Sequence, residues 1–181
     1  AVIGGGEASE GDDVPADIDI QGGRERGLVM HKLFEEVLTG EVRDDQASLA
    51  ARAAVLIGEL GRMPADDPGQ GCNPAELAAS VVRALALPEI VAVRPSLLAE
   101  CQVYAYEAGT DADVVTFGIA DAIGFTNRQA NLVIDWKSDV APDEKTIAGY
   151  REQVRDYLRA TSVKAGLIVF PTSGRVERVS L

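Results

Sequence analysis

Two opposite charges follow one apolar segment of the sequence. The aliphatic run 132–134 is followed by Asp135, Trp136 and Lys137. Successive side chains of a strand point to opposite faces, so Asp135 and Lys137 share one face. Three aliphatic residues in a row are typical of a central strand that is covered on both faces. The pattern predicts a carboxylate beside an ammonium group at the end of a buried strand. An ordinary ion pair that ends a strand would have the same pattern.

A second carboxylate, Asp121, lies in the preceding segment among apolar residues. At a period of two, the residues that share its face are Phe117, Ile119, Ile123 and Phe125. A buried ionised carboxylate is costly unless a cation or hydrogen-bond donors compensate for it. A turn at 126–128 would pair this segment with the Asp135 strand as a hairpin, so both carboxylates could meet as the hard oxygen ligands that Mg²⁺ requires. The alternative is a buried Asp121 paired with Lys137 or Arg128.

The only histidine, His31, lies in a segment with helical periodicity, 24–39. A core or boundary histidine is the ordinary interpretation of such a residue. Gly27, one turn earlier, costs a helix about 1 kcal/mol relative to Ala. It therefore indicates either close packing against another element or the start of the helix.

A later helical segment, 143–161, carries Tyr150, Gln153 and Tyr157 on one face. A polar Gln between two tyrosines on the apolar side indicates a hydrogen-bonding role near the site. A boundary Gln on an ordinary amphipathic helix is the alternative.

The elements that must position these residues follow from periodicity and turn signals. Helices are expected over 24–39 and 45–60, and from an N-cap at Asn73 with Pro74 and Glu76 to about Leu87, where Pro88 disfavours helical geometry in the residue before it. Strands are expected over 97–107, 113–125 and 129–137, then the helix 143–161, then strands over 164–171 and 175–180. Residues 1–23 are Gly-rich and acidic and are expected to be a linker or tail, which leaves 24–181 as the domain.

Composition limits the classes of function. The 181 residues carry a net charge of −12, which argues against an autonomous nucleic-acid binder but not against a nuclease, because a bound cation reverses the local sign. Cys72 and Cys101 are too few for a disulfide scaffold or a Cys-rich zinc site. We expect a cytoplasmic protein that does not contact a membrane. The chain begins at Ala1 without a Met, from which we expect a fragment of a longer protein.

Taken together, these motifs resemble the C-terminal nuclease domain of RecB- and AddA-type, UvrD-like helicase–nucleases in the PD-(D/E)XK superfamily. The resemblance covers about residues 24 to 180. The segments that carry it are Gly27-x-x-x-His31 with Phe34-Glu35, Glu100 at the first strand, Gly118-Ile119-Ala120-Asp121, Asp135-Trp136-Lys137-Ser138, and Tyr150, Gln153 and Tyr157 as a Y-x-x-Q-x-x-x-Y helix. Trp136 and Ser138 stand where Tyr and Thr are usual.

The resemblance implies an α/β (α+β) fold: a central mixed sheet of about five strands, with an αβββαβ restriction-endonuclease-like core and an extra N-terminal helical layer. It also implies a Mg²⁺-dependent deoxyribonuclease of the exonuclease type, in which Mn²⁺ can substitute. The implied metal ligands are His31, Asp121, Asp135 and the backbone carbonyl of Trp136. The implied catalytic set is Asp121, Asp135, Lys137, Gln153 and Tyr157, while the role of Glu100 stays open.

The parent protein would then be a bacterial-type, ATP-binding helicase–exonuclease that acts in double-strand break repair and recombination. Its partners would be DNA, as a single strand or a duplex end, the helicase domains of the parent chain and a partner subunit. Two alternatives remain. One is a nuclease-fold module that has lost catalysis and serves as an interaction or DNA-path domain. The other is a plain α/β scaffold with Asp121 and Lys137 as a buried ion pair.

Overall fold

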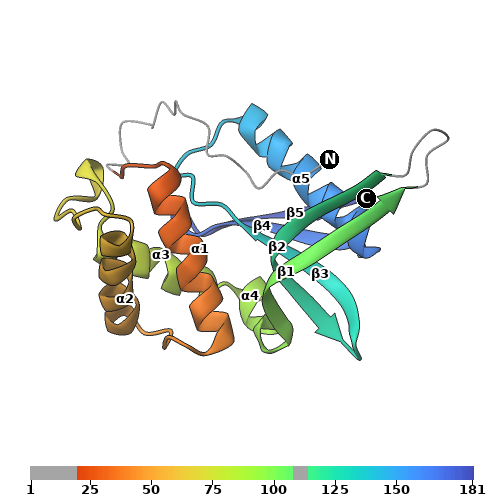
Figure 1. The fold of residues 1–181 in the computed structure, drawn as a ribbon, viewed down its shortest axis with the longest axis horizontal. Coiled ribbons are helices and arrows are strands. Elements are labelled where there is room, and N and C mark those ends of the chain that lie inside the picture. The colour runs from red at the N-terminus through yellow and green to blue at the C-terminus, as the bar shows by residue number, and fades with distance from the viewer. Residues whose placement is uncertain (1–19, 108–113) are drawn as a thin grey trace.

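A computed structural model describes residues 20–107 and 114–181 of the protein (Figure 1). The expected linker over 1–23 therefore lies almost entirely outside the described residues. The helices are α1 (Arg24–Thr39), α2 (Gln46–Glu59), α3 (Pro74–Leu85), α4 (Pro88–Val93) and α5 (Glu144–Thr161), with short 3-10 turns at Pro68–Gln70 and Arg94–Ser96. The strands are β1 (Leu97–Glu107), β2 (Val114–Thr126), β3 (Gln129–Trp136), β4 (Ala165–Phe170) and β5 (Arg175–Ser180).

The five strands form one mixed sheet in the order β1-β2-β3-β4-β5. All neighbouring pairs are antiparallel except β3 and β4, which run parallel and are connected through α5. This arrangement confirms the expected α+β class with a mixed sheet of five strands. None of the helices in the described part of the chain combines the length and apolar character that a bilayer crossing requires.

Helices cover the sheet on two sides (Figure 1). One core lies between the sheet and the layer formed by α1 to α4, and a second core lies between the sheet and α5. Strand β3 contributes to both, because Val133 belongs to the α5 core and Ile134 to the other. Its last four residues, 133–136, are all buried, as the aliphatic run predicted for a central strand.

Among the α-helices of the described residues, α4 is the one that the sequence did not predict. Pro88 was expected only to end the preceding helix, and α3 does end before it, at Leu85. Leu87 is extended, at ψ 136°, as a residue before proline prefers, and Pro88 then occupies the first position of α4. Proline is tolerated there because its missing N–H would have no partner inside the helix. The expected cap of α3 is confirmed, since the Asn73 side chain accepts the backbone N–H of Glu76 at 2.8 Å.

The expected hairpin between β2 and β3 is also confirmed. Thr126 pairs with Gln129, and the two residues between them, Asn127 and Arg128, have φ angles of 52° and 66°. Two left-handed residues in a two-residue loop are typical of a type I′ turn, whose twist matches that of the strands. The pairing then shifts by one residue between Gly124 and Phe125, so that Ala122 lies opposite Ile134. This shifted register, and not the turn alone, carries Asp121 and Asp135 toward the same end of the sheet.

Candidate metal and catalytic site

The site begins where β2 and β3 separate. Their ladder runs from the turn to Ala122, which lies opposite Ile134. At the preceding residue of β2, Asp121, a side chain replaces the backbone as the hydrogen-bond acceptor: its Oδ2 accepts the Trp136 N–H at 2.7 Å. A carboxylate thus occupies the opening between the diverging strands, and its other oxygen remains available to groups from α1 and β1.

Three metal-binding residue types meet at this opening. His31, Glu100 and Asp121 each offer a ligand atom, and these atoms lie within 4.8 Å of one another. His31 Nδ1 is 3.1 Å from Asp121 Oδ1. Helix α1 supplies the histidine, and the β1–β2 register places Glu100 opposite Asp121, since Ala99 pairs with Ala122 and Cys101 with Ala120. We call these three residues the carboxylate–histidine cluster.

Glu100 reaches the cluster with an unusual backbone. Its φ is 51°, in the left-handed region, although it lies inside a strand. Such a conformation costs a non-glycine residue about 1–3 kcal/mol, and residues held in this way concentrate at functional sites. Desolvation and the neighbouring charge of Asp121 raise the pKa of the Glu100 carboxyl. The sequence left the role of Glu100 open, and the structure brings it into contact range of both other members of the cluster.

The pKa of His31 depends on two neighbouring aspartates, Asp121 and Asp135. Burial lowers the pKa of His31, but the charge of Asp121 and the hydrogen bond to it, together with the charge of Asp135, outweigh burial and raise the pKa. The side chain is 34% exposed, so His31 is a boundary residue and not a core one. The ion pair of Asp121 with Lys137 or Arg128 is not what forms; Asp121 contacts His31 and the Trp136 N–H.

Asp135 and Lys137 form a second, deeper pair on the α5 side of the cluster. Their carboxylate and ammonium groups lie 2.9 Å apart, and the residues are 4% and 8% exposed. Burial raises the pKa of Asp135 to about 6, and the charge of Asp121 adds to the rise while that of Lys137 opposes it. Oδ2 is close to Lys137 but makes no well-aligned hydrogen bond within the described part of the chain. This buried carboxylate oxygen therefore faces the Lys137 ammonium group, 2.9 Å away, and a further contact would use its second lone pair.

Helix α5 fixes Lys137 from behind. The Lys137 Nζ donates to Gln153 Oε1 at 2.8 Å and lies 4.4 Å from the centre of the Tyr150 ring, and both residues belong to α5. Tyr150 in turn donates its hydroxyl to Asp139 Oδ2 at 2.7 Å. The expected hydrogen-bonding role of Gln153 is thereby located, whereas the contacts of Tyr150 and Asp139 were not foreseen. The helical spacing could have predicted the position of Tyr150 beside Lys137, because Tyr150 lies one turn before Gln153 on the same face of α5.

Tyr157 acts on the backbone of β2. Its hydroxyl donates to the carbonyl of Ile119 at 2.7 Å, two residues before Asp121. Burial raises the pKa of Tyr157 to about 12, with Asp135 and Asp121 adding to the rise, so the hydroxyl keeps its proton. Tyr157 therefore supports the strand that carries Asp121, and it is not bonded to Lys137.

Close packing places α1 against the site. Trp136 turns its side chain toward α1, where it stacks on Phe34 with ring centroids 4.2 Å apart, so only its backbone faces the cluster. A Cβ at Gly27 would lie 3.1 Å from Ser138 Oγ, which confirms the close-packing interpretation of this glycine. The expected apolar row around Asp121 does not form as predicted, because Ile123 is 4% exposed in the α5 core, together with Ala120, whereas Phe117 and Ile119 are 43% and 45% exposed on the other face.

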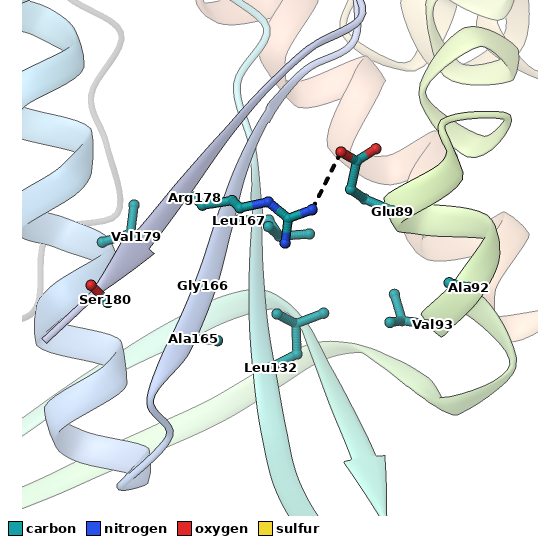
Figure 2. Close-up of a pocket in the computed structure, with 10 residues that line it drawn as sticks. All are labelled: Glu89, Ala92, Val93, Leu132, Ala165, Gly166, Leu167, Arg178, Val179 and Ser180. Carbon is teal, nitrogen blue, oxygen red and sulfur yellow. Dashed lines mark hydrogen bonds and ion pairs between the residues drawn. The ribbon is translucent and has the colours of Figure 1, made fainter.

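A hollow elsewhere on the surface lies apart from this chemistry. Figure 2 shows it between α4 and strands β4 and β5, where Arg178 reaches toward Glu89 at 3.5 Å. No member of the cluster and neither Asp135 nor Lys137 lines it. Apart from the Ser180 hydroxyl, its remaining lining is aliphatic or backbone.

Comparison with known proteins does not indicate a function for this protein. No family model and no curated protein matches the sequence. Among solved structures, a crystal structure of SSO0001 is 19% identical with a TM-score of 0.41, over 86% of this chain and 76% of that one. Protein VC1899 from Vibrio cholerae is 12% identical with a TM-score of 0.34, over 84% of this chain and 48% of that one.

Proposed function

We propose that the protein is a metal-dependent DNA nuclease that hydrolyses phosphodiester bonds at the carboxylate–histidine cluster. The observation that carries the proposal is the meeting of His31, Glu100 and Asp121 within 4.8 Å, beside the buried pair Asp135 and Lys137. Three possible ligands from three elements, next to a fixed ammonium group, are the components of metal-assisted hydrolysis. An ion-paired scaffold would not require the strained backbone of Glu100.

The donor set suits a hard divalent cation. Mg²⁺ binds oxygen ligands at about 2.1 Å in an octahedron, so two adjacent ligands are about 3 Å apart and two opposite ones about 4.2 Å apart. His31 Nδ1 and Asp121 Oδ1 are 3.1 Å apart in a direct hydrogen bond, which a bound ion would replace. Glu100 offers a further oxygen within the cluster, and Asp135, paired with Lys137, lies beside it. Imidazole beside carboxylates also suits Mn²⁺, which we propose as a substitute.

The chain's own residues would then divide the work. A divalent ion would supply Lewis-acid polarisation of the scissile phosphate and acidify a water molecule. Lys137, held between Asp135 and Gln153, places a positive charge where negative charge develops on the phosphate. Tyr157 holds the β2 backbone and with it Asp121. The Trp136 N–H donates to Asp121, and we propose that the Trp136 carbonyl is a further ligand of the ion.

By its resemblance, we further propose that the domain belongs to a cytoplasmic helicase–nuclease that acts on DNA ends in double-strand break repair and recombination. The net charge of −12 is consistent with helicase domains and a partner subunit that grip the DNA. The alternative of a catalytically inactive nuclease-fold module is separated from this proposal by measuring metal binding and cleavage on the same preparations.

The test compares two exchanges at the site with two matched exchanges on the surface. Lys137→Ala and Asp135→Asn should each lower Mg²⁺-dependent cleavage of linear DNA by at least about 100-fold, the usual scale for losing a charge-stabilising or general acid–base group. Lys145→Ala and Asp156→Asn, at exposed positions of α5, should cleave like the wild type. Circular dichroism would verify that all four variants fold.

Calorimetric titration with Mn²⁺ provides the second measurement. We expect the wild type to bind the ion and His31→Ala and Asp121→Asn to bind it at least tenfold more weakly. Full cleavage by folded Lys137→Ala would overturn the proposal. Mn²⁺ binding by a wild-type protein that cleaves no DNA would favour the inactive module.

A further inference from the structure

Three large apolar side chains lie exposed on one side of the β1–β2 hairpin. Tyr104, Phe117 and Ile119 are 61%, 43% and 45% exposed. Tyr104 and Phe117 are opposite each other in the strand register, and their ring centroids lie 6.1 Å apart at an interplanar angle of 26°. The Tyr104 hydroxyl donates to Gln102 Oε1 at 2.8 Å, which holds the ring in place. We call these three side chains the aromatic platform.

The platform is on the same side of the hairpin as the carboxylate–histidine cluster. Side chains two residues apart share one face, so Phe117 and Ile119 lie in one row of β2 and Tyr104 and Gln102 in the row beside it on β1. Residues between them, such as Val103 and Ala120, are buried in the α5 core on the other face. The face with Phe117 and Tyr104 is therefore turned away from the α5 core, and His31 of α1 approaches Asp121 from the same side. Successive positions in a row are about 7 Å apart, so the platform leads directly to the carboxylates.

The charges of this face indicate how it would hold a ligand. Neither β1 nor β2 contains a lysine or an arginine. A surface that grips duplex DNA neutralises phosphates with such residues. Base rings, by contrast, stack on aromatic side chains whatever their sequence. A duplex hides its base faces, whereas a single strand or a frayed end presents them.

We propose that the aromatic platform stacks the bases of single-stranded DNA and so delivers the strand to the carboxylate–histidine cluster. The inference rests on the proposed nuclease function, because it names the form of DNA that this site receives. It assigns Tyr104 and Phe117 to substrate binding, and it gives an acidic domain a way to hold DNA that depends little on phosphate contacts.

A cross-strand aromatic pair can also simply stabilise a hairpin, by about 0.2–1 kcal/mol. The variant Tyr104→Leu/Phe117→Leu separates the two roles, because leucine keeps apolar contact across the strands but has no aromatic face. Val55→Ala is the matched control, since Val55 is 51% exposed on α2, outside the sheet. Thermal unfolding would show that both variants retain the fold.

The experiment measures polarisation of a labelled oligothymidylate with the full chain in Ca²⁺. The leucine variant should bind at least about fivefold more weakly, the lower limit for loss of one stacked base, and Val55→Ala should bind like the wild type. The plot of log affinity against log salt concentration should have a slope of only about 1 to 2 in magnitude, as few phosphates are contacted. A 5-iodouracil oligonucleotide should photocrosslink to Tyr104 or Phe117.

Equal binding by the folded leucine variant, or crosslinks only outside β1 and β2, would overturn the inference. So would a change in sedimentation of that variant without a change in DNA binding, which would assign the face to protein contact. These results leave the cleavage test at Lys137 untouched. Conversely, full cleavage by Lys137→Ala together with platform-dependent binding would overturn the nuclease proposal alone.

Discussion

The ammonium group of Lys137 contacts three side chains of the site. Asp135 pairs with its ammonium group, Gln153 accepts a hydrogen bond from it, and the Tyr150 ring lies against it. These contacts restrict a lysine side chain that otherwise has many rotamers, and they therefore orient its ammonium group. Gln153 is therefore a positioning residue that acts through Lys137.

The exchange Gln153→Ala tests this role. It should lower the rate of cleavage by about 10- to 100-fold, the usual effect of removing a supporting hydrogen bond at a metal site. The affinity for Mn²⁺ should stay the same, because Gln153 accepts its hydrogen bond from Lys137, which is not a member of the carboxylate–histidine cluster. Glu152→Gln is the matched control, since Glu152 is 62% exposed and pairs with Arg155. Weakened Mn²⁺ binding by Gln153→Ala would show that Gln153 acts on the metal site and not on Lys137.

At the residue scale, the sequence predicted positions better than contacts. Asp135 and Lys137 could be placed on one face because a strand has a period of two. The approach of His31 to Asp121 could not be derived that way, because 90 residues separate them and only the packing of α1 brings them together. Glu100 needed a backbone conformation that no pattern of residue types announces.

At the scale of elements, α5 lies unusually close to β4. A Cβ built on Gly166 would come 2.5 Å from Val154 Cγ1 and 3.5 Å from Leu158 Cδ2. Only a residue without a side chain lets the helix approach the strand to this distance. The approach matters for the site, because the same helix carries Gln153 and Tyr157.

Two glycine-to-alanine exchanges separate close approach from helix propensity. Gly166→Ala should destabilise the protein by about 1–3 kcal/mol through overpacking against Val154. Gly149→Ala, on the open face of α5 with nothing within 4 Å of its Cβ, should stabilise it by up to about 1 kcal/mol. Urea unfolding followed by circular dichroism measures both. A neutral Gly166→Ala would mean that α5 can retreat from β4.

The elements themselves followed well from periodicity. Helix α1 has the expected bounds, and the other predicted helices and strands end within two residues of theirs. Helix α4 was missed because six residues are too few for a periodic signal, and its Pro88 has two opposite meanings. Proline ends the helix before it and can begin the one after it.

At the scale of the whole molecule, a buried ionic network joins the layers. Arg26 of α1 is 2% exposed and forms a two-pronged ion pair with Glu76 of α3. It also donates to the Thr172 hydroxyl in the β4–β5 turn at 2.7 Å and to the carbonyl of Ser138 after β3 at 3.3 Å. One side chain thus connects both helices to the segments that follow β3 and β4, and the helical periodicity of residues 24–39 did not predict it.

Arg26→Met should destabilise the protein by about 2–4 kcal/mol, because it removes the ion pair of Glu76, which is 13% exposed and keeps only the hydrogen bond from Ser80 among the described residues. Arg26→Met/Glu76→Leu should recover part of that loss, since it removes both charges. Arg62→Met is the control: Arg62 and its partner Glu25 are 62% and 43% exposed, and such a pair is worth about 1 kcal/mol or less. Denaturant midpoints compare the three. A double variant less stable than the single one would show that the network holds more than a paired charge.

The stacking of Trp136 on Phe34 has one more consequence. Trp136 is the only tryptophan of the protein, is 1% exposed, and lies between Asp135 and Lys137. Its indole spans the boundary between α1 and the sheet, while its backbone N–H holds Asp121. The intrinsic emission of the protein therefore originates at the candidate site, and the native sequence carries its own optical reporter of whether α1, and His31 with it, is docked against β3.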